Sequence, residues 1–536
     1  MHRVACGVEK KEEGPGIKGA FFLPALLALC ITGTMLNPAA QSPDTVPRIQ
    51  QLLQSGDTAA AQTLLSRALQ ESPGDGGLYA LQGVLKAQQG DFVAAEANLL
   101  RAIQLAPRLE GAYLNLGRLY QEHISKDPGS REKALGVYAG LLRFAPNHRE
   151  ANYQCAVLLM QKKEYASSLR HLARLPSEVQ SHPQTLSVEC GDYAGLGQLD
   201  KAARVADQML GSAGLAEADV TSILPVLASR ENAALAIKLL QGLVTRQLAS
   251  FESLRSLGLL YQSVGRLGEA RQTLASAAQL RPGSVPNLLD LARVANAQKD
   301  YPGALGYLAH ARDLEPNNAL IHFFWGIVCI EQSLAEEAYQ SLKKAVALNP
   351  QNASYNYAFG VVAMQRQYAN ESLPYLKKYC KLKPQDPLGR LALGAAYFNS
   401  HDDEAAEKVL SAATRDSQTA AAAYFYLGRI ANRQGQYPEA LRDLDRAVRL
   451  RPDYADALAE VGIIRLKRRQ YAASEQALEK ALQLSPDNYA ANLNLMILYQ
   501  RTKNPKAEQQ AKRFEQIKEE SAKRALEFMR TIEVRP

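Results

Sequence analysis

The chain has 536 residues, of which 47% are apolar and 22% are charged. This composition excludes a mostly disordered chain, because such chains lack the apolar surface that would offset the conformational entropy lost on folding. Lys and Arg number 62 and Asp and Glu 54, and this mild net charge of +8 bears on solubility rather than on fold. Only one stretch approaches the length of a membrane span, so a polytopic membrane protein is also excluded.

The N-terminal segment 1–40 has the pattern of an export signal. Basic residues such as Arg3 precede an uncharged run over 20–36, and the small residues Ala39 and Ala40 follow it. This order is typical of a secretory signal peptide. An uncleaved N-terminal membrane anchor and an artefact of start-site choice are the alternatives. The first two interpretations predict an exported protein, either periplasmic or otherwise extracytoplasmic, or attached to the membrane by its N-terminus.

The rest of the chain follows a period of 34 residues. Small residues recur at this spacing, at Gly258, Ala292, Gly326, Gly360, Gly394, Gly428 and Gly462. A leucine follows each of them by 16 positions, at Leu274, Leu308, Leu342, Leu376, Leu410, Leu444 and Leu478. The apolar spacing predicts two helices per period, with a turn near Gly265 and a stop at Pro282. We expect the small residue to let the second helix approach closely. Such a hairpin cannot bury its own apolar face, so neighbouring hairpins must stack.

These residues resemble the tetratricopeptide repeat family, whose pattern is W-x₂-L-G-x₂-Y, then A-x₃-F, then P within 34 residues. In one period the match consists of Leu257-Gly258-x-x-Tyr261, Ala270-x-x-x-Leu274 and Pro282. The resemblance implies an all-α fold, a right-handed α–α superhelix of about 12–13 helix-turn-helix repeats. It also implies that the first helix of each repeat lines the concave surface.

The register of the repeats predicts the domain organisation. Residues 41–210 form an N-terminal array, with a lengthened loop at 123–132. Residues 211–250 lose the register and are expected to form either a degenerate helical hinge between two arrays or an atypical repeat pair. Residues 251–500 form a regular array, and 501–536 a basic C-terminal capping helix.

The capping helix is expected to turn Phe514, Ile517 and Leu526 inward. Residues 501–536 carry ten Lys or Arg against six Glu, and a short basic cluster spans 465–469. Glutamates are interspersed and aromatic residues are few, which favours a solvated helix face over nucleic-acid binding. No nucleic-acid partner is therefore predicted.

The sequence contains no recognisable catalytic, cofactor or metal site. No histidine is at ligand spacing from a cysteine or another histidine, and no phosphate loop, dinucleotide motif or nucleophile elbow occurs. We therefore predict no catalytic residue, no cofactor, no metal and no enzymatic activity. Cys155, Cys190, Cys329 and Cys380 have no metal-ligand spacing, and they fit best as buried small residues. A disulfide between Cys155 and Cys190 stays open, since sequence alone cannot establish one.

The first helices around 320–430 carry the candidate binding residues. The resemblance places the groove positions at fixed offsets from each small residue. These positions hold Phe323, Phe324, Ile327, Ile330, Tyr357, Val361, Met364, Phe398, Phe425, Tyr426 and Arg429. An exposed apolar patch of this kind marks an interaction surface, with Arg and Asn on either side to orient the ligand. The alternative is that these residues pack against their own neighbours.

Two known uses of the family's groove do not fit. The family's carboxylate clamp requires Lys and Asn where this chain has Phe323, Ile327, Tyr357 and Val361. The asparagine ladder of a sugar transferase superhelix is also absent from the series. The predicted function is a non-enzymatic scaffold or adaptor that holds a protein or peptide in the concave groove. The alternatives are an accessory module of an enzyme complex, such as a transferase partner, and an envelope assembly factor that self-associates.

Overall fold

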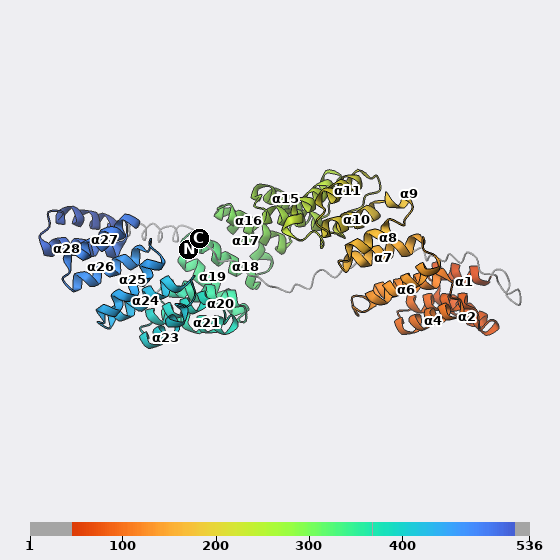
Figure 1. The fold of residues 1–536 in the computed structure, drawn as a ribbon, viewed down its shortest axis with the longest axis horizontal. Helices are drawn as coiled ribbons and strands as arrows, with labels where there is room; N and C mark the ends of the chain where they lie inside the picture. The colour runs from red at the N-terminus through yellow and green to blue at the C-terminus, as the bar shows by residue number, and fades with distance from the viewer. Residues whose placement is uncertain (1–44, 367, 520–536) are drawn as a thin grey trace. The chain divides into compact units, whose positions relative to one another are not determined.

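The computed structural model describes residues 45–366 and 368–519 (Figure 1). Every regular element among these residues is a helix, which confirms the predicted all-α fold. The chain divides into two compact units between Leu280 and Arg281. The expected signal peptide or anchor at 1–40 lies outside the described residues.

The first unit consists of helical hairpins in chain order. Its helices are α1 (Thr45–Gln54), α2 (Thr58–Glu71), α3 (Gly76–Gln88), α4 (Phe92–Leu105), α5 (Glu110–His123), α6 (Ser130–Phe144), α7 (Arg149–Gln161), α8 (Tyr165–Leu172), α9 (Ser177–Gln180), α10 (Pro183–Gly195), α11 (Leu199–Gly211), α12 (Glu217–Thr221), the 3-10 helix η1 (Arg230–Asn232), α13 (Ala233–Thr245), α14 (Phe251–Ser263) and α15 (Leu267–Leu280).

The second unit continues the same pattern of paired helices. Its helices are α16 (Val285–Ala297), α17 (Tyr301–Leu314), α18 (Ala319–Glu331), α19 (Ala335–Leu348), α20 (Ala353–Gln365), α21 (Ala369–Leu382), α22 (Pro387–Asn399), α23 (Asp403–Ala413), α24 (Ala420–Arg433), α25 (Tyr437–Leu450), α26 (Ala455–Lys467), α27 (Tyr471–Leu484) and α28 (Tyr489–Thr502). Each even-numbered helix from α16 to α26 packs on the next one to close a hairpin.

A glycine-to-leucine contact joins the two helices of most hairpins in the regular array, as the period predicts. A Cβ added to Gly360 would lie 2.7 Å from Cγ of Leu376, and one on Gly326 would lie 2.6 Å from Cγ of Leu342. Both leucine side chains are 0% exposed. Burial of each leucine contributes about 1.5–3 kcal/mol. The small residue is therefore needed because the second helix lies directly against it.

Among the described residues, several hairpin turns place one residue in the left-handed backbone region. Gly265 and Gly435 supply it with φ of 80° and 78°. Other hairpins place a residue with a side chain there, such as Lys299 at 62° and His401 at 64°. An L-residue in this conformation is strained by about 1–2 kcal/mol. These turns are tolerated because the two flanking helices fix their geometry.

A polar side chain joins consecutive hairpins at a buried position that the sequence pattern did not single out. Four residues before Gly360, Nδ2 of Asn356 donates to the carbonyl of Pro350 at 2.9 Å. Asn492 makes the same bond to Pro486 at 3.0 Å. The proline ends the preceding helix, so this hydrogen bond satisfies a carbonyl that the helix itself leaves unpaired.

The predicted loop at 123–132 is shorter than expected. Helix α5 extends to His123 and α6 begins at Ser130, so helix absorbs both ends of the insertion. Within the connection, Oδ1 of Asp127 accepts the backbone N–H of Gly129 at 3.0 Å. This hydrogen bond stabilises the turn that leads into α6.

Segment 211–250 contains one short helix and one full helix. Helix α12 packs against α10 and α13, so α12 and α13 occupy the place of a hairpin whose first helix is shortened. The Glu217 carboxylate accepts the backbone N–H of Ser250 at 2.8 Å, which joins this pair to the start of α14. The segment lies inside the first unit, and its action as a hinge stays a prediction.

The described part of the C-terminal segment covers the end of the second unit. After α28, a helical stretch spans 507–519. Phe514 and Ile517 on it are each 5% exposed, and the Phe514 ring centroid lies 5.1 Å from that of Tyr489. These two side chains therefore face inward, whereas Leu526 lies outside the described residues.

Candidate functional site

The predicted binding residues lie on α18, α20, α22 and α24, the first helices of four consecutive hairpins. Helix α20 packs against α22, α22 against α24 and α24 against α26. The first helices therefore form a continuous layer. The side chains that this layer leaves at least partly exposed, here named the first-helix band, are Phe324, Ile327, Ile330, Tyr357, Val361, Met364 and Tyr426.

Three predicted groove residues are buried, so the expectation that they are exposed is wrong. Phe323, Phe398 and Phe425 are 4%, 5% and 8% exposed. Phe323 lies 4.9 Å from the Tyr355 ring of the next hairpin. Phe425 lies 5.0 Å from the Tyr454 ring of the next hairpin. These aromatic rings pack between hairpins and form the floor beneath the band.

Two guanidinium groups cover the third buried phenylalanine. Cζ of Arg433 lies 4.0 Å from the centroid of the Phe398 ring, and Cζ of Arg429 lies 4.7 Å from it. A cation over an aromatic face is attracted by the negative potential of the ring. Phe398 therefore reaches a ligand only through these two side chains.

The band itself carries no charge. Its phenols belong to Tyr357 and Tyr426, and burial raises the pKa of both, so they stay protonated at neutral pH. The remaining members are hydrocarbon or thioether side chains, and Ile330 is the most exposed of the large ones at 37%. Such a surface can bind apolar side chains but offers nothing to a charged group.

An arginine stands at each end of the band. Arg293 lies over the Phe324 ring at 5.1 Å, and its Nη1 is 3.5 Å from the Asp290 carboxylate. At the other end, Nε of Arg429 is 3.2 Å from the Glu460 carboxylate. Burial raises the pKa of Glu460, while Arg429 opposes that rise. The band is thus flanked by polar groups that can orient a ligand, as the sequence predicts for Arg429.

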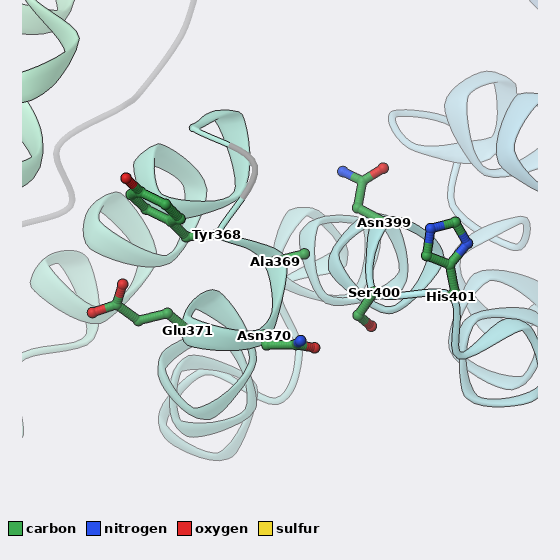
Figure 2. A pocket seen from close by; sticks show the side chains of 7 residues that line it. All are labelled: Tyr368, Ala369, Asn370, Glu371, Asn399, Ser400 and His401. Atoms are coloured by element: carbon green, nitrogen blue, oxygen red, sulfur yellow. The ribbon is translucent and has the colours of Figure 1, made fainter.

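A polar pocket of about 390 Å³ lies between the start of α21 and the end of α22 (Figure 2). Tyr368 and the first turn of α21 line it on one side, and the end of α22 with the turn after it lines the other, with the residues Tyr368, Ala369, Asn370, Glu371, Asn399, Ser400 and His401. Glu371 accepts hydrogen bonds from the Tyr339 hydroxyl at 2.6 Å and from the Lys343 ammonium at 3.1 Å. These bonds lower its pKa, the one from Tyr339 most, so Glu371 is unsuited to general acid catalysis at neutral pH. Sequence reasoning did not find this pocket, because its polar residues at helix ends and in a turn follow no apolar period.

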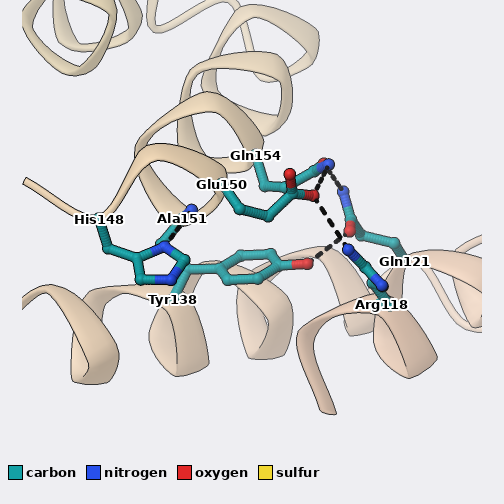
Figure 3. A network of polar contacts seen from close by, with 7 residues as sticks. All are labelled: Arg118, Gln121, Tyr138, His148, Glu150, Ala151 and Gln154. Carbon is teal, nitrogen blue, oxygen red and sulfur yellow. Dashed lines mark hydrogen bonds and ion pairs between the residues drawn. The ribbon is translucent and has the colours of Figure 1, made fainter. Parts of the chain in front are cut away.

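The first unit places polar groups on the equivalent helices (Figure 3). The buried Tyr138 hydroxyl donates to Gln121 at 2.7 Å, and Gln121 donates to Gln154 at 2.9 Å. Gln154 then donates to Glu150 at 2.8 Å, and the same carboxylate lies 3.4 Å from Arg118. These side chains satisfy one another between α5 and α7. The network therefore stabilises the contact between hairpins and is chemically unlike the band.

The described residues contain no group of side chains that could hold a metal ion. Among the same residues, no helix is both long and apolar enough to span a bilayer. Cys155 and Cys190 are buried free thiols, so the disulfide left open by the sequence is not formed in this structure. Burial raises the pKa of each to about 12, which keeps both protonated and unreactive.

Comparison with known proteins gives one family. A family model described as tetratricopeptide repeat matches residues 48–110, 289–353, 391–455 and 432–489. No curated protein matches the chain. Similar solved structures include a tetratricopeptide repeat protein from Parabacteroides merdae, with 16% identity over 46% of this chain and 98% of that one, at a TM-score of 0.39. The APC/C hetero-tetramer Cut9-Hcn1 has 14% identity over 86% of this chain and 97% of that chain, at a TM-score of 0.39. Pseudomonas aeruginosa pilF has 22% identity over 38% of this chain and 92% of that chain, at a TM-score of 0.33.

Proposed function

The chain is a multi-repeat protein of the tetratricopeptide repeat family, and from that premise we propose a non-enzymatic scaffold that holds a protein or peptide segment on the first-helix band. Stacked repeats of this kind present extended surfaces for partner binding. The observation that carries the proposal is the uncharged, partly exposed band on α18 to α24 with an arginine at each end. Apolar anchors of the partner supply affinity there, and the flanking polar groups fix its direction.

The proposal places the protein outside the cytoplasm. It rests on the export pattern of residues 1–40, with either a cleaved signal or a retained membrane anchor. Cell fractionation together with N-terminal sequencing of the mature chain tests this part. A chain that stays in the cytoplasm with its N-terminus intact contradicts it.

The binding role is tested by capture from an envelope extract. The variant Ile330→Ser, Val361→Ser, Met364→Ser removes apolar surface that is already partly exposed, and circular dichroism checks that the fold is retained, since Val361 and Met364 also pack against a core cluster. The control variant Leu314→Ser, Leu348→Ser, Leu382→Ser changes equally apolar side chains on second helices that are 46%, 39% and 37% exposed. We expect partners of the wild-type chain to be lost from the first variant and kept by the control. Equal capture by both variants places the site elsewhere.

Two other functions make different predictions in the same experiment. If the protein is an accessory module of an enzyme complex, the capture should recover a catalytic chain, such as a transferase, and the band variant should lose it. A self-associating assembly factor would recover the chain itself and would sediment as an oligomer. Monomeric sedimentation at high concentration excludes the second of these.

A further inference from the structure

The structure contains a strongly basic patch that the proposed function does not use. It consists of Lys467, Arg468, Arg469, Arg501 and Lys503, here named the basic edge. The first three lie at the end of α26 and in the turn after it, and the other two lie at the same place on α28. Helices α26 and α28 pack against each other, so the five cations share one edge of the second unit.

None of these cations makes an ion pair among the described residues, and all five side chains are exposed. The Glu460 carboxylate pairs with Arg429 at 3.2 Å and also interacts electrostatically with Lys467. Glu479 lies 3.3 Å from Lys506. The positive charge of Arg468, Arg469, Arg501 and Lys503 is therefore not paired within the described fold.

The helix dipole does not account for so many cations at this edge. A cation near a helix C-terminus is stabilised by about 0.3–1 kcal/mol, and every first helix offers such a position. The equivalent positions on α18 and α22 carry Glu331, Ser333, Asn399 and His401 instead. Other first helices carry one or two cations at this place, such as Arg433 on α24 and Lys162 and Lys163 after α7, whereas α26 and α28 together carry five.

The basic edge is continuous with the first-helix band. Arg433 lies over the Phe398 ring at 4.0 Å. The residue before it, Asn432, accepts at Oδ1 a hydrogen bond from Nζ of Lys467 at 3.1 Å. A partner that leaves the band at α24 therefore reaches the basic edge next.

We propose that the partner segment carries apolar anchors followed by a run of Asp or Glu, with the acidic run over α26 and α28. This inference rests on the proposed function and names the chemistry and direction of its ligand. Packed helices lie about 8–10 Å apart, and an extended chain advances about 3.3 Å per residue. Two helix spacings separate α24 from α28, so the acidic run lies within about six residues of the last anchor.

The surroundings favour a polypeptide over a nucleic acid. Single-stranded nucleic acid is bound by cations together with exposed aromatic rings on which bases stack. The basic edge contains no aromatic residue, and the adjoining band contains no cation that could neutralise a phosphate chain. An acidic polypeptide needs only the charge, and its apolar anchors use the band.

The test is selection from a random peptide display library on the full chain. We expect selected peptides to share an apolar or aromatic core with Asp or Glu enriched on one side of it, within about six residues. The variant Lys467→Glu, Arg468→Glu, Arg469→Glu should bind a selected peptide about tenfold or more weakly. The control variant Lys381→Glu, Lys383→Glu, Arg449→Glu makes the same charge change at exposed positions on α21, after it and on α25, and should change affinity less than about twofold.

Each other outcome has a definite meaning. Peptides that depend on the band but show no acidic enrichment overturn this inference and leave the proposed function standing. Failure to select any peptide that depends on Ile330, Val361 and Met364 overturns the proposed function itself. If the wild-type chain binds poly(U) or phosphatidylglycerol vesicles and only the basic-edge variant loses this binding, the edge binds a different anion. That result also overturns the inference. The milder variant Arg501→Gln, Lys503→Gln repeats the comparison if the triple variant does not fold.

Discussion

Asp192 gives the first unit a stability that depends on pH. This residue of α10 is 0% exposed, and neither carboxylate oxygen has a hydrogen bond among the described residues. The neighbouring Ser168 hydroxyl already donates its hydrogen to the Ala156 carbonyl at 2.9 Å. Burial raises the pKa of Asp192 from 3.8 to about 8, although Ser168 opposes the rise and Glu189 adds to it. The carboxyl group is therefore protonated at neutral pH in the folded state.

The sign of the effect follows from this raised pKa. Between pH 4 and pH 8 the folded state holds a proton that the unfolded state has lost, so stability falls as the pH rises. One proton corresponds to about 1.36 kcal/mol per pH unit. From pH 6 to pH 8 the region around α8 and α10 should lose about 2 kcal/mol, which is about a thirtyfold change in its opening equilibrium.

Hydrogen exchange measured by mass spectrometry can test this prediction. Repeat arrays open locally, so exchange in α8 and α10, corrected for intrinsic rates, reports the stability of this region. The variant Asp192→Asn keeps the shape of the side chain and removes the titration. The amide is neutral in both states, so we expect the variant to match the wild type only near pH 4, where the unfolded wild type still holds its proton. Above pH 4 the variant should be more protected, and its advantage should grow by the amount above between pH 6 and pH 8. Asp200→Asn on the exposed start of α11 is the control. Equal pH dependence in wild type and Asp192→Asn would refute the reasoning.

Three further predictions concern the repeat scaffold. Gly360→Ala should destabilise the second unit by about 1–3 kcal/mol in urea unfolding followed by tryptophan fluorescence, because the added Cβ would lie 2.7 Å from Cγ of Leu376. Gly435→Ala should lower the free energy of unfolding by about 1 kcal/mol through backbone strain alone, since nothing lies within 4 Å of the added Cβ. Lys299→Gly removes such strain at φ of 62° and should raise the free energy of unfolding by up to about 1 kcal/mol. Melting followed by circular dichroism measures both changes. Phe425→Ser should cost about 3 kcal/mol and lower the melting temperature, because this ring is 8% exposed. A thermally neutral Phe425→Ser would mean that the ring lies on the surface after all.

The sequence predicted the repeated contacts because each period of 34 residues encodes them locally. Gly360 and Leu376 are 16 positions apart in one hairpin, so their meeting needs no knowledge of other repeats. The same reasoning failed for segment 211–250, where the period is lost and α12 is cut short. There the backbone conformation depends on contacts with α10 and α13, which no local spacing reveals.

The candidate site was predictable as a face but not residue by residue. Helix α18 is apolar on nearly all sides, so its sequence does not tell which aromatic rings are covered. Phe323 is covered by Tyr355 from the next hairpin, whereas its neighbour Phe324 stays partly exposed. The fixed offsets of the family describe one isolated repeat, and the burial of each ring depends on which residue the following repeat supplies.

The scaffold and the proposed binding surface use different residues of the same helices. In α20, Gly360 contacts Leu376, which is 0% exposed, so a substitution of this glycine lowers the stability of the fold. Val361 and Met364 on the same helix are partly exposed and pack only at the edge of a core cluster, so they have less packing to lose. Substitutions in the band should therefore change partner binding while leaving unfolding nearly unchanged, within about 0.5 kcal/mol for each exposed position. Such a separation lets one repeated fold carry different surfaces on different hairpins, with an uncharged band on α18 to α24 and a basic edge on α26 and α28.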